Sequence, residues 1–173
     1  MKSILFIGSF LSSRTGTISV VEKLGSLWIK NKKFKLKYSS RKKNKIFRLI
    51  NIIYDALNFK GELVHIDVFS GFSLIISYFA AIISLFKAKD IYLTLRGGSI
   101  PFQYKKNKFI YECLFKISTN IASPSKFIIL NLPDKFNIHY LPNPIDRNIF
   151  KPPASSIKRD NLLWVRAFSK IYN

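Results

Sequence analysis

Residues 63–98 read LVHIDVFSGFSLIISYFAAIISLFKAKDIYLTLRGG, and this stretch decides the fold class. Two short apolar runs, 63–68 and 91–95, flank a longer apolar segment at 72–86. The short runs are typical of buried parallel strands, and the longer one predicts a helix that is apolar on nearly all sides. A strand, a helix and a strand in this order predict a right-handed βαβ unit.

The same alternation continues in both directions along the chain. Strands are predicted at 4–7 and 34–38 on the N-terminal side, and at 120–122 and 138–141 on the C-terminal side. Helical patterns separate these runs. We therefore expect an α/β fold, a Rossmann-like three-layer αβα domain with a mainly parallel sheet.

The helix predicted before residue 63 is amphipathic. Gly61 follows it, where a C-terminal helix cap is expected. The residues that mark its apolar side are Ile46, Leu49, Ile50, Ile53 and Leu57.

The 173 residues suffice for one domain with a sizeable core but are few for two. Residues 1–150 are expected to form the α/β domain, and 151–160, with Pro152 and Pro153, a linker. Residues 161–173 begin with one more apolar run. A lone strand cannot bury its own faces, so this run either joins the first sheet or is the stub of a C-terminal domain.

The formal net charge is +20, and ten basic residues fall between Lys30 and Arg48 without a carboxylate. Such a field attracts anionic partners: a membrane surface, a lipid-linked acceptor or nucleic acid, of which nucleic acid is the least expected. A solvated face is the alternative.

Cys113 is the only cysteine, which fits a reducing compartment and a buried thiol.

The segment 72–86 is shorter than the ~20 apolar residues of a membrane span, and serines interrupt it. A helix packed in the core of the domain explains it better. We expect a cytoplasmic protein, either free or peripheral on the inner face of the plasma membrane.

Several stretches, in the right order along the chain, carry a family resemblance. The segment YLPNPID (140–146), followed by Phe150 and Pro152, resembles the I-P-N-G-V-D-x-x-x-F-x-P stretch of glycosyltransferase family 4. The other stretches that resemble this family are the first strand with its glycine loop (4–8 and Gly16), LVHID (63–67), LTLRGG (93–98), IASPS (121–125) and LLWVRAF (162–168).

This resemblance implies one half of a two-domain GT-B enzyme, the N-terminal acceptor-side domain. Such an enzyme transfers a sugar from a nucleotide-sugar, its donor substrate, to a saccharide or lipid-linked acceptor, usually without a metal or other cofactor. The donor domain would follow residue 173, so the chain alone is expected to be inactive. It would then be a truncated product, a fragment, or one part of a split enzyme whose partner is a separate donor-domain chain.

The resemblance also assigns candidate site residues. Asp67 is the acidic candidate for contact with the acceptor hydroxyl or for catalysis as a base. Arg96 stands where many family members carry a histidine. It cannot act as a base but can hold a phosphate or carboxylate, the alternative being a structural salt bridge. The proposed substrate-binding set is Gly16, Thr17, Arg96, Gly97, Gly98 and Asn143.

Other readings remain open at this point. Gly16 and Thr17 also fit an ordinary turn and helix cap, and His65 fits a satisfied core histidine. Asn143 is expected to hold the crossover between domains. Two distant histidines and one cysteine predict no zinc site. The rival functions are a non-catalytic basic module that binds anionic membrane and a nucleic-acid binder that uses Lys30–Arg48.

Overall fold

The computed structural model describes residues 2–10, 18–30, 34–39 and 44–145. Gly16, Thr17, the linker at 151–160 and the segment 161–173 lie outside these residues. The described elements run β1 (Lys2–Ile7), α2 (Val20–Lys30), β2 (Phe34–Ser39), α3 (Lys45–Leu57), β3 (Leu63–Val68), α4 (Phe72–Phe86), β4 (Asp90–Leu95), α5 (Ile100–Lys106), α6 (Lys108–Lys116), β5 (Asn120–Ser123), α7 (Lys126–Leu130), a 3₁₀ turn (Asp134–Phe136) and β6 (His139–Tyr140).

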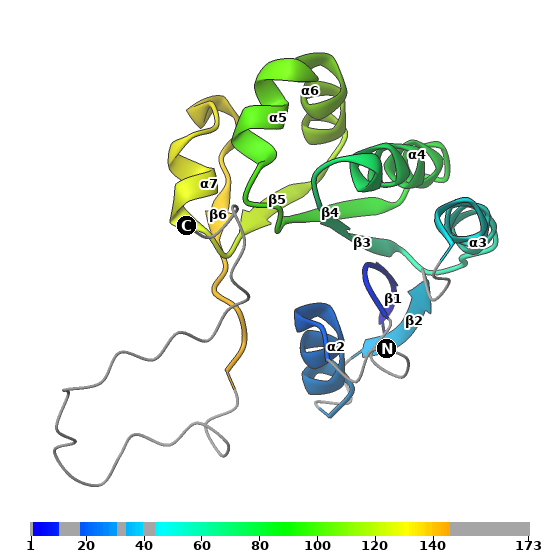
Figure 1. Ribbon diagram of the computed structural model, residues 1–173. Coiled ribbons are helices and arrows are strands. Elements are labelled where there is room, and N and C mark those ends of the chain that lie inside the picture. Colours follow the sequence, from blue (N-terminus) through cyan, green and yellow to red (C-terminus); the bar gives the residue numbers. More distant parts are fainter. Residues whose placement is uncertain (1, 11–17, 31–33, 40–43, 146–173) are drawn as a thin grey trace, which may run out of the picture.

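The described strands form one sheet in the order β2-β1-β3-β4-β5-β6, and every neighbouring pair is parallel (Figure 1). This confirms the α/β, Rossmann-like fold class predicted from the alternation of strands and helices. The chain moves outward from β1 to β2, then returns across β1 to β3. Because the direction of strand addition reverses there, β1 and β3 border the topological switch point.

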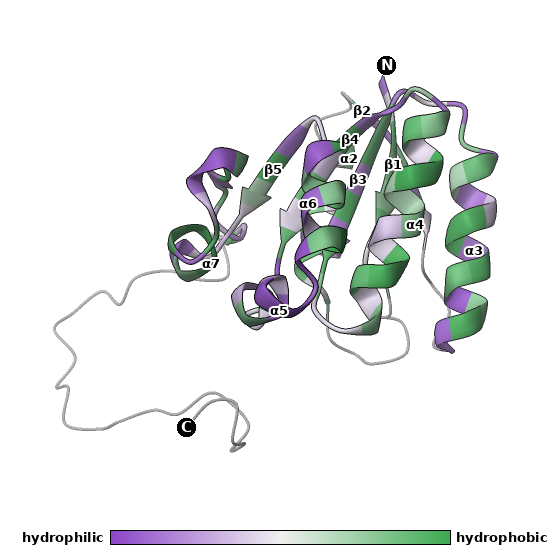
Figure 2. Cartoon of the chain, turned by 90° about the horizontal axis from the view of Figure 1, so that it is seen from above, coloured by the Kyte–Doolittle hydropathy of each residue, from purple (hydrophilic) through white to green (hydrophobic). Residues whose placement is uncertain are grey.

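Helices pack on both faces of the sheet (Figure 1). On one face, α2 packs over β1 and β2, where Val21, Leu24 and Trp28 meet Ile4 and Phe6. On the other face, α3, α4 and α6 lie side by side over the larger core (Figure 2). A capping box opens α2, since Glu22 N donates to Ser19 Oγ and Ser19 N donates to Glu22 Oε2.

The amphipathic helix predicted from the sequence is α3, but much of its apolar side does not face the core. Its buried side chains are Ile52, Asp55 and Ala56, whereas Ile46, Ile50 and Leu57 are exposed. Polar contacts hold the inner side of α3 against the sheet. The carboxylate of Asp55 accepts hydrogen bonds from Ser39 Oγ at 2.7 Å and from Asn51 Nδ2 at 3.1 Å, and lies 2.9 Å from Lys37 Nζ.

The C-cap predicted for α3 needs correction. It is Asn58, not Gly61. A Cβ at Gly61 would lie 2.7 Å from Ser3 O, so this glycine lets the chain pass close to β1.

The α4 helix buries one side, but Phe79 and Phe86 on its other side are exposed. Among the described helices, none combines the length and the apolarity needed to cross a membrane.

Candidate functional site

The carboxyl ends of the strands border a cavity of about 300 Å³ beside the switch point. Each loop that follows β1, β3, β4, β5 and β6 contributes at least one residue to its wall. In open parallel sheets this edge is where ligands bind. The lining residues are Ser9, Ser19, Val20, Val21, Asp67, Phe69, Arg96, Pro124 and Asn143.

Three polar side chains of this wall form a hydrogen-bonded chain. Asp67 lies near the end of β3 and Arg96 directly after β4, and Arg96 Nε donates to Asp67 Oδ2 at 2.8 Å. Arg96 Nη1 donates to Asn143 Oδ1, also at 2.8 Å. The three residues come from segments far apart in sequence. The parallel sheet brings them together, because Asp67 is paired with Thr94 across β3 and β4.

The Asp67 carboxylate is only half satisfied. Its side chain is 1% exposed, and Oδ1 has no hydrogen-bond partner among the described residues. Burial raises the pKa of Asp67 to about 6, although the guanidinium of Arg96 opposes that rise. A buried, incompletely paired carboxylate that lines a cavity is the kind of group often found at functional sites.

His65 lies beneath this cluster and is buried. Its Nε2 is 2.8 Å from Thr94 Oγ1, and its ring packs 4.5 Å from the ring centroid of Phe6. Burial, assisted by the positive charge of Arg96, lowers the pKa of His65 to about 3. The ring is therefore neutral at pH 7. Its 3.6 Å approach to Asp67 Oδ1 is a contact of a neutral imidazole and not an ion pair.

The two glycines after Arg96 have different roles. A Cβ at Gly97 would lie 2.8 Å from the backbone nitrogen of Ser70, so the loops after β3 and β4 meet here at a distance that only glycine permits. A Cβ at Gly98 would meet nothing within 4 Å. Gly97 therefore fixes the position of Arg96, whereas Gly98 leaves open space beside it.

The N-terminus of α2 also borders the cavity. The N-terminus of a helix as long as α2 can bind an anion through its backbone N–H groups. Here the carboxylate of Glu22 bonds to Ser19 N, and Ser19 Oγ donates to Ser9 O at 2.7 Å. The carboxylate of Glu22 thus already occupies the positive end of α2. Among the described residues that line the cavity, Arg96 is the positively charged one that can bind a ligand.

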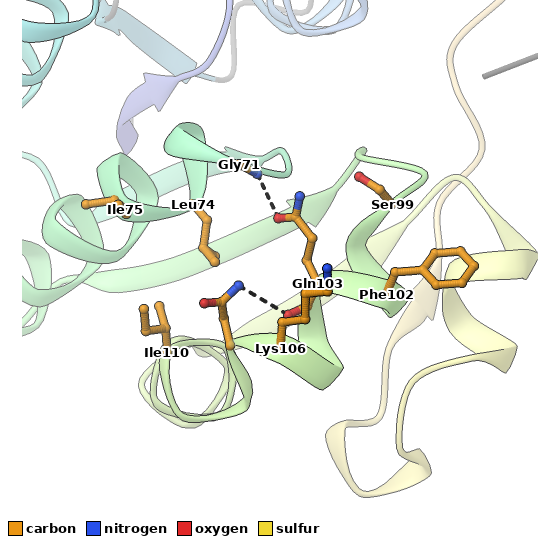
Figure 3. Close-up of a pocket in the computed structure, with 9 residues that line it drawn as sticks. Gly71, Leu74, Ile75, Ser99, Phe102, Gln103, Lys106 and Ile110 are labelled. Atoms are coloured by element: carbon orange, nitrogen blue, oxygen red, sulfur yellow. Dashed lines mark hydrogen bonds between the residues drawn. The ribbon is translucent and has the colours of Figure 1, made fainter. Parts of the chain in front are cut away.

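A second cavity, of about 560 Å³, lies between α4 and the α5–α6 pair (Figure 3). Gln103 closes one side of it by accepting a hydrogen bond from Gly71 N at 2.7 Å. Leu74, Ile75 and Ile110 line it, and Lys106 is its charged residue. Both cavities combine apolar walls with polar groups, but only the smaller one is lined by a buried carboxylate with an oxygen that has no partner among the described residues, so it is the better candidate.

The structure thus brings together Asp67, Arg96 and Asn143, with Gly97 and Gly98 beside them. Gly16 and Thr17 lie outside the described residues. The site residues chosen from the sequence do not include Ser9, Phe69 and Pro124, which also line the cavity, although each follows a predicted strand and that position could have indicated them. The part of the chain that the structure describes holds no cluster of three or more metal-binding side chains.

The fold and this edge define a Rossmann-like α/β domain with a candidate ligand site at its topological switch point. Comparison with protein-family models, with curated proteins and with solved structures found no match.

Proposed function

We propose that this domain is the acceptor-side half of a glycosyltransferase with GT-B architecture, acting on a saccharide or lipid-linked acceptor. The observation that carries the proposal is the chain of hydrogen bonds from Asp67 through Arg96 to Asn143 at the switch point. All three residues were singled out by the resemblance to glycosyltransferase family 4. That they are in contact is a feature the resemblance did not predict.

In this proposal Arg96 and Asn143 contact the ligand. The side chain of Arg96 is 10% exposed and lines the cavity, and its Nη2 has no acceptor among the described residues. A guanidinium with an unused edge can donate to a phosphate or to sugar hydroxyls. Asn143 is exposed and can donate through its amide while its oxygen accepts from Arg96.

Asp67 acts as a positioning residue with respect to Arg96. With 1% of its side chain exposed, it does not reach an acceptor hydroxyl while Arg96 covers it. A role as catalytic base would require Arg96 to swing away. A carboxyl with a pKa of about 6 would then accept a proton near neutral pH.

The test is a binding measurement, because it reads the interaction with the acceptor without requiring sugar transfer. The full chain is titrated with hexoses, N-acetylhexosamines and their phosphate esters, and binding is followed by saturation-transfer NMR. We expect one class of saccharide or sugar phosphate to bind and Arg96→Gln to weaken it about tenfold, the loss of one charge-assisted hydrogen bond.

Lys116→Gln is the matched control, since it removes one positive charge from the exposed last turn of α6. It should leave the affinity within about twofold, because a distant exposed charge is screened by salt. The proposal fails if no saccharide or sugar phosphate binds, or if Arg96→Gln and Lys116→Gln weaken binding equally.

A further inference from the structure

The inward side of helix α3 is mixed, since Ile52 and Ala56 pack in the core next to the buried Asp55. Asp55 accepts hydrogen bonds from Ser39 of β2 and from Asn51 of the same helix, and Arg48 Nη2 donates to Gly8 O at 3.1 Å. A surface helix of a globular domain normally turns its polar side to solvent. Here the solvent side carries Ile46, Phe47, Ile50, Tyr54 and Leu57, all exposed.

The neighbouring helix α4 extends this surface. Phe72, Ile75, Phe79 and Phe86 recur at helical spacing on its outer side, and all four are exposed. Because α3 and α4 pack against each other along their length, the two rows lie side by side (Figure 2). We call the nine side chains on α3 and α4 the apolar face.

The apolar face is large for a surface without a partner. Each of its side chains is at least 40% exposed, and five are aromatic. Contiguous apolar patches beyond a few hundred Å² are rare on soluble monomers and mark interaction sites. With aromatic side chains offering roughly 200 Å² each, this face exceeds that size.

Positive charges outnumber negative ones near the apolar face, although exposed Glu62 and Asp90 lie in the segments that follow α3 and α4. Helices α3 to α6 contain six basic residues and two acidic ones, Asp55 and Glu112. Both acids are already ion-paired, with Lys37 and Lys135. At one end of the face Lys45 Nζ lies 5.9 Å from the centroid of the Phe72 ring, and exposed Lys87 follows Phe86 at the other end.

We propose that the apolar face docks on an anionic lipid surface. Aromatic and aliphatic side chains enter the boundary between headgroups and acyl chains, while flanking lysines bind the lipid phosphates. A protein partner would need a complementary acidic rim, and a second copy of this chain carries the same positive charge. The lipid surface satisfies both the apolar and the electrostatic requirement.

A membrane contact through the apolar face goes beyond the proposed glycosyltransferase function. It also differs from the contact expected from the sequence. The basic stretch Lys30–Arg48 was expected to bind through charge alone. The apolar face instead centres on side chains of α3 and α4. Both helices begin at the carboxyl edge of the sheet, the edge that also borders the cavity at Arg96.

Co-sedimentation of the full chain with phosphatidylglycerol–phosphatidylcholine vesicles and with pure phosphatidylcholine vesicles tests the proposal. We expect at least tenfold stronger binding to the anionic vesicles. A triple variant with Phe47→Ser, Ile50→Ser and Phe79→Ser should lose at least tenfold of that binding. The control triple, Leu27→Ser, Ile29→Ser and Leu130→Ser, removes exposed apolar side chains from α2 and α7 and should stay within twofold.

A second readout does not depend on the triple variant folding. An environment-sensitive fluorophore on Phe79→Cys, in a Cys113→Ser background, should shift its emission to the blue with anionic vesicles, and the same label on Leu130→Cys should not. Undiminished binding of a folded triple variant would overturn the proposal in favour of the basic stretch. A dimer that the triple variant dissociates, without vesicle binding by the unchanged chain, would assign the face to a second copy. Neither readout requires sugar transfer, so failure here leaves the saccharide-binding test unaffected.

Discussion

Asp55 and Asp67 are both buried aspartates, but their surroundings differ. Both oxygens of Asp55 have partners, which tie β2 to α3. Asp67 has one satisfied oxygen, bonded to Arg96, and one without a partner among the described residues. Fully satisfied buried groups stabilise a fold, and a half-satisfied group in a cavity wall is better explained by a ligand or a task. The difference assigns Asp55 to the stability of the fold and Asp67 to the candidate site.

The largest expected effect comes from removing the satisfied carboxylate. Asp55→Ala should lower the free energy of unfolding by about 3 kcal/mol, because it breaks a buried network and leaves the hydroxyl of Ser39 without a partner. Urea denaturation measures the change. Lys37→Ala is the control and should cost less than about 1 kcal/mol, since Lys37 is 44% exposed. A loss below 1 kcal/mol for Asp55→Ala would show that the two aspartates do not differ in this way.

The sequence indicated the site better than it indicated the packing of α3. The alternation of apolar runs placed Asp67 and Arg96 at carboxyl ends of parallel strands, which is where they lie. Their contact could not be predicted, because it depends on β3 and β4 being neighbours with Asp67 opposite Thr94. Strand order is a tertiary property, and apolar runs do not specify it.

The apolar periodicity of α3 does not reveal which side of the helix faces the core, for a physical reason. A periodic apolar side predicts which side of a helix avoids water, on the assumption that water lies on the other side. The edge strand β2 offers polar partners, Lys37 and Ser39, so Asp55 turns inward and Ile46 and Ile50 turn outward. Only the pairing of a polar helix side with a polar strand edge could have revealed this.

An intermediate effect is expected at Gly97, the first of the two glycines that follow Arg96. Gly97→Ala should lower the free energy of unfolding by about 2 kcal/mol. The new Cβ would lie too close to the backbone nitrogen of Ser70, and a backbone atom cannot move away as the end of a flexible side chain can. Gly98→Ala should stay within about 0.5 kcal/mol, as it enters open space. Thermal or urea unfolding separates the two. Equal costs would mean that the loops after β3 and β4 do not meet as closely as described.

The smallest effect expected in the unmodified chain concerns pH, because Asp67 and His65 oppose each other. The pKa of Asp67 rises from 3.8 to about 6 on folding, so between these values the folded state binds more protons and this residue adds stability as the pH falls. The pKa of His65 falls from 6.5 to about 3, so the unfolded state binds more protons and this residue removes stability as the pH falls. Between pH 4 and 6 the two contributions largely cancel.

Separating the pair should therefore reveal slopes of opposite sign. Asp67→Asn leaves His65 alone and should make stability fall on acidification from pH 6 to 4, by about 1 kcal/mol per pH unit. His65→Gln leaves Asp67 alone and should make stability rise over the same range. His139→Gln, at an exposed histidine of β6, should leave the slope unchanged. The readout is the slope of unfolding free energy against pH, so a uniform loss of stability in one variant does not affect it. Identical slopes in Asp67→Asn and the unmodified chain would mean that Asp67 is as well satisfied as Asp55, and the argument that sets it apart as a site residue would fall.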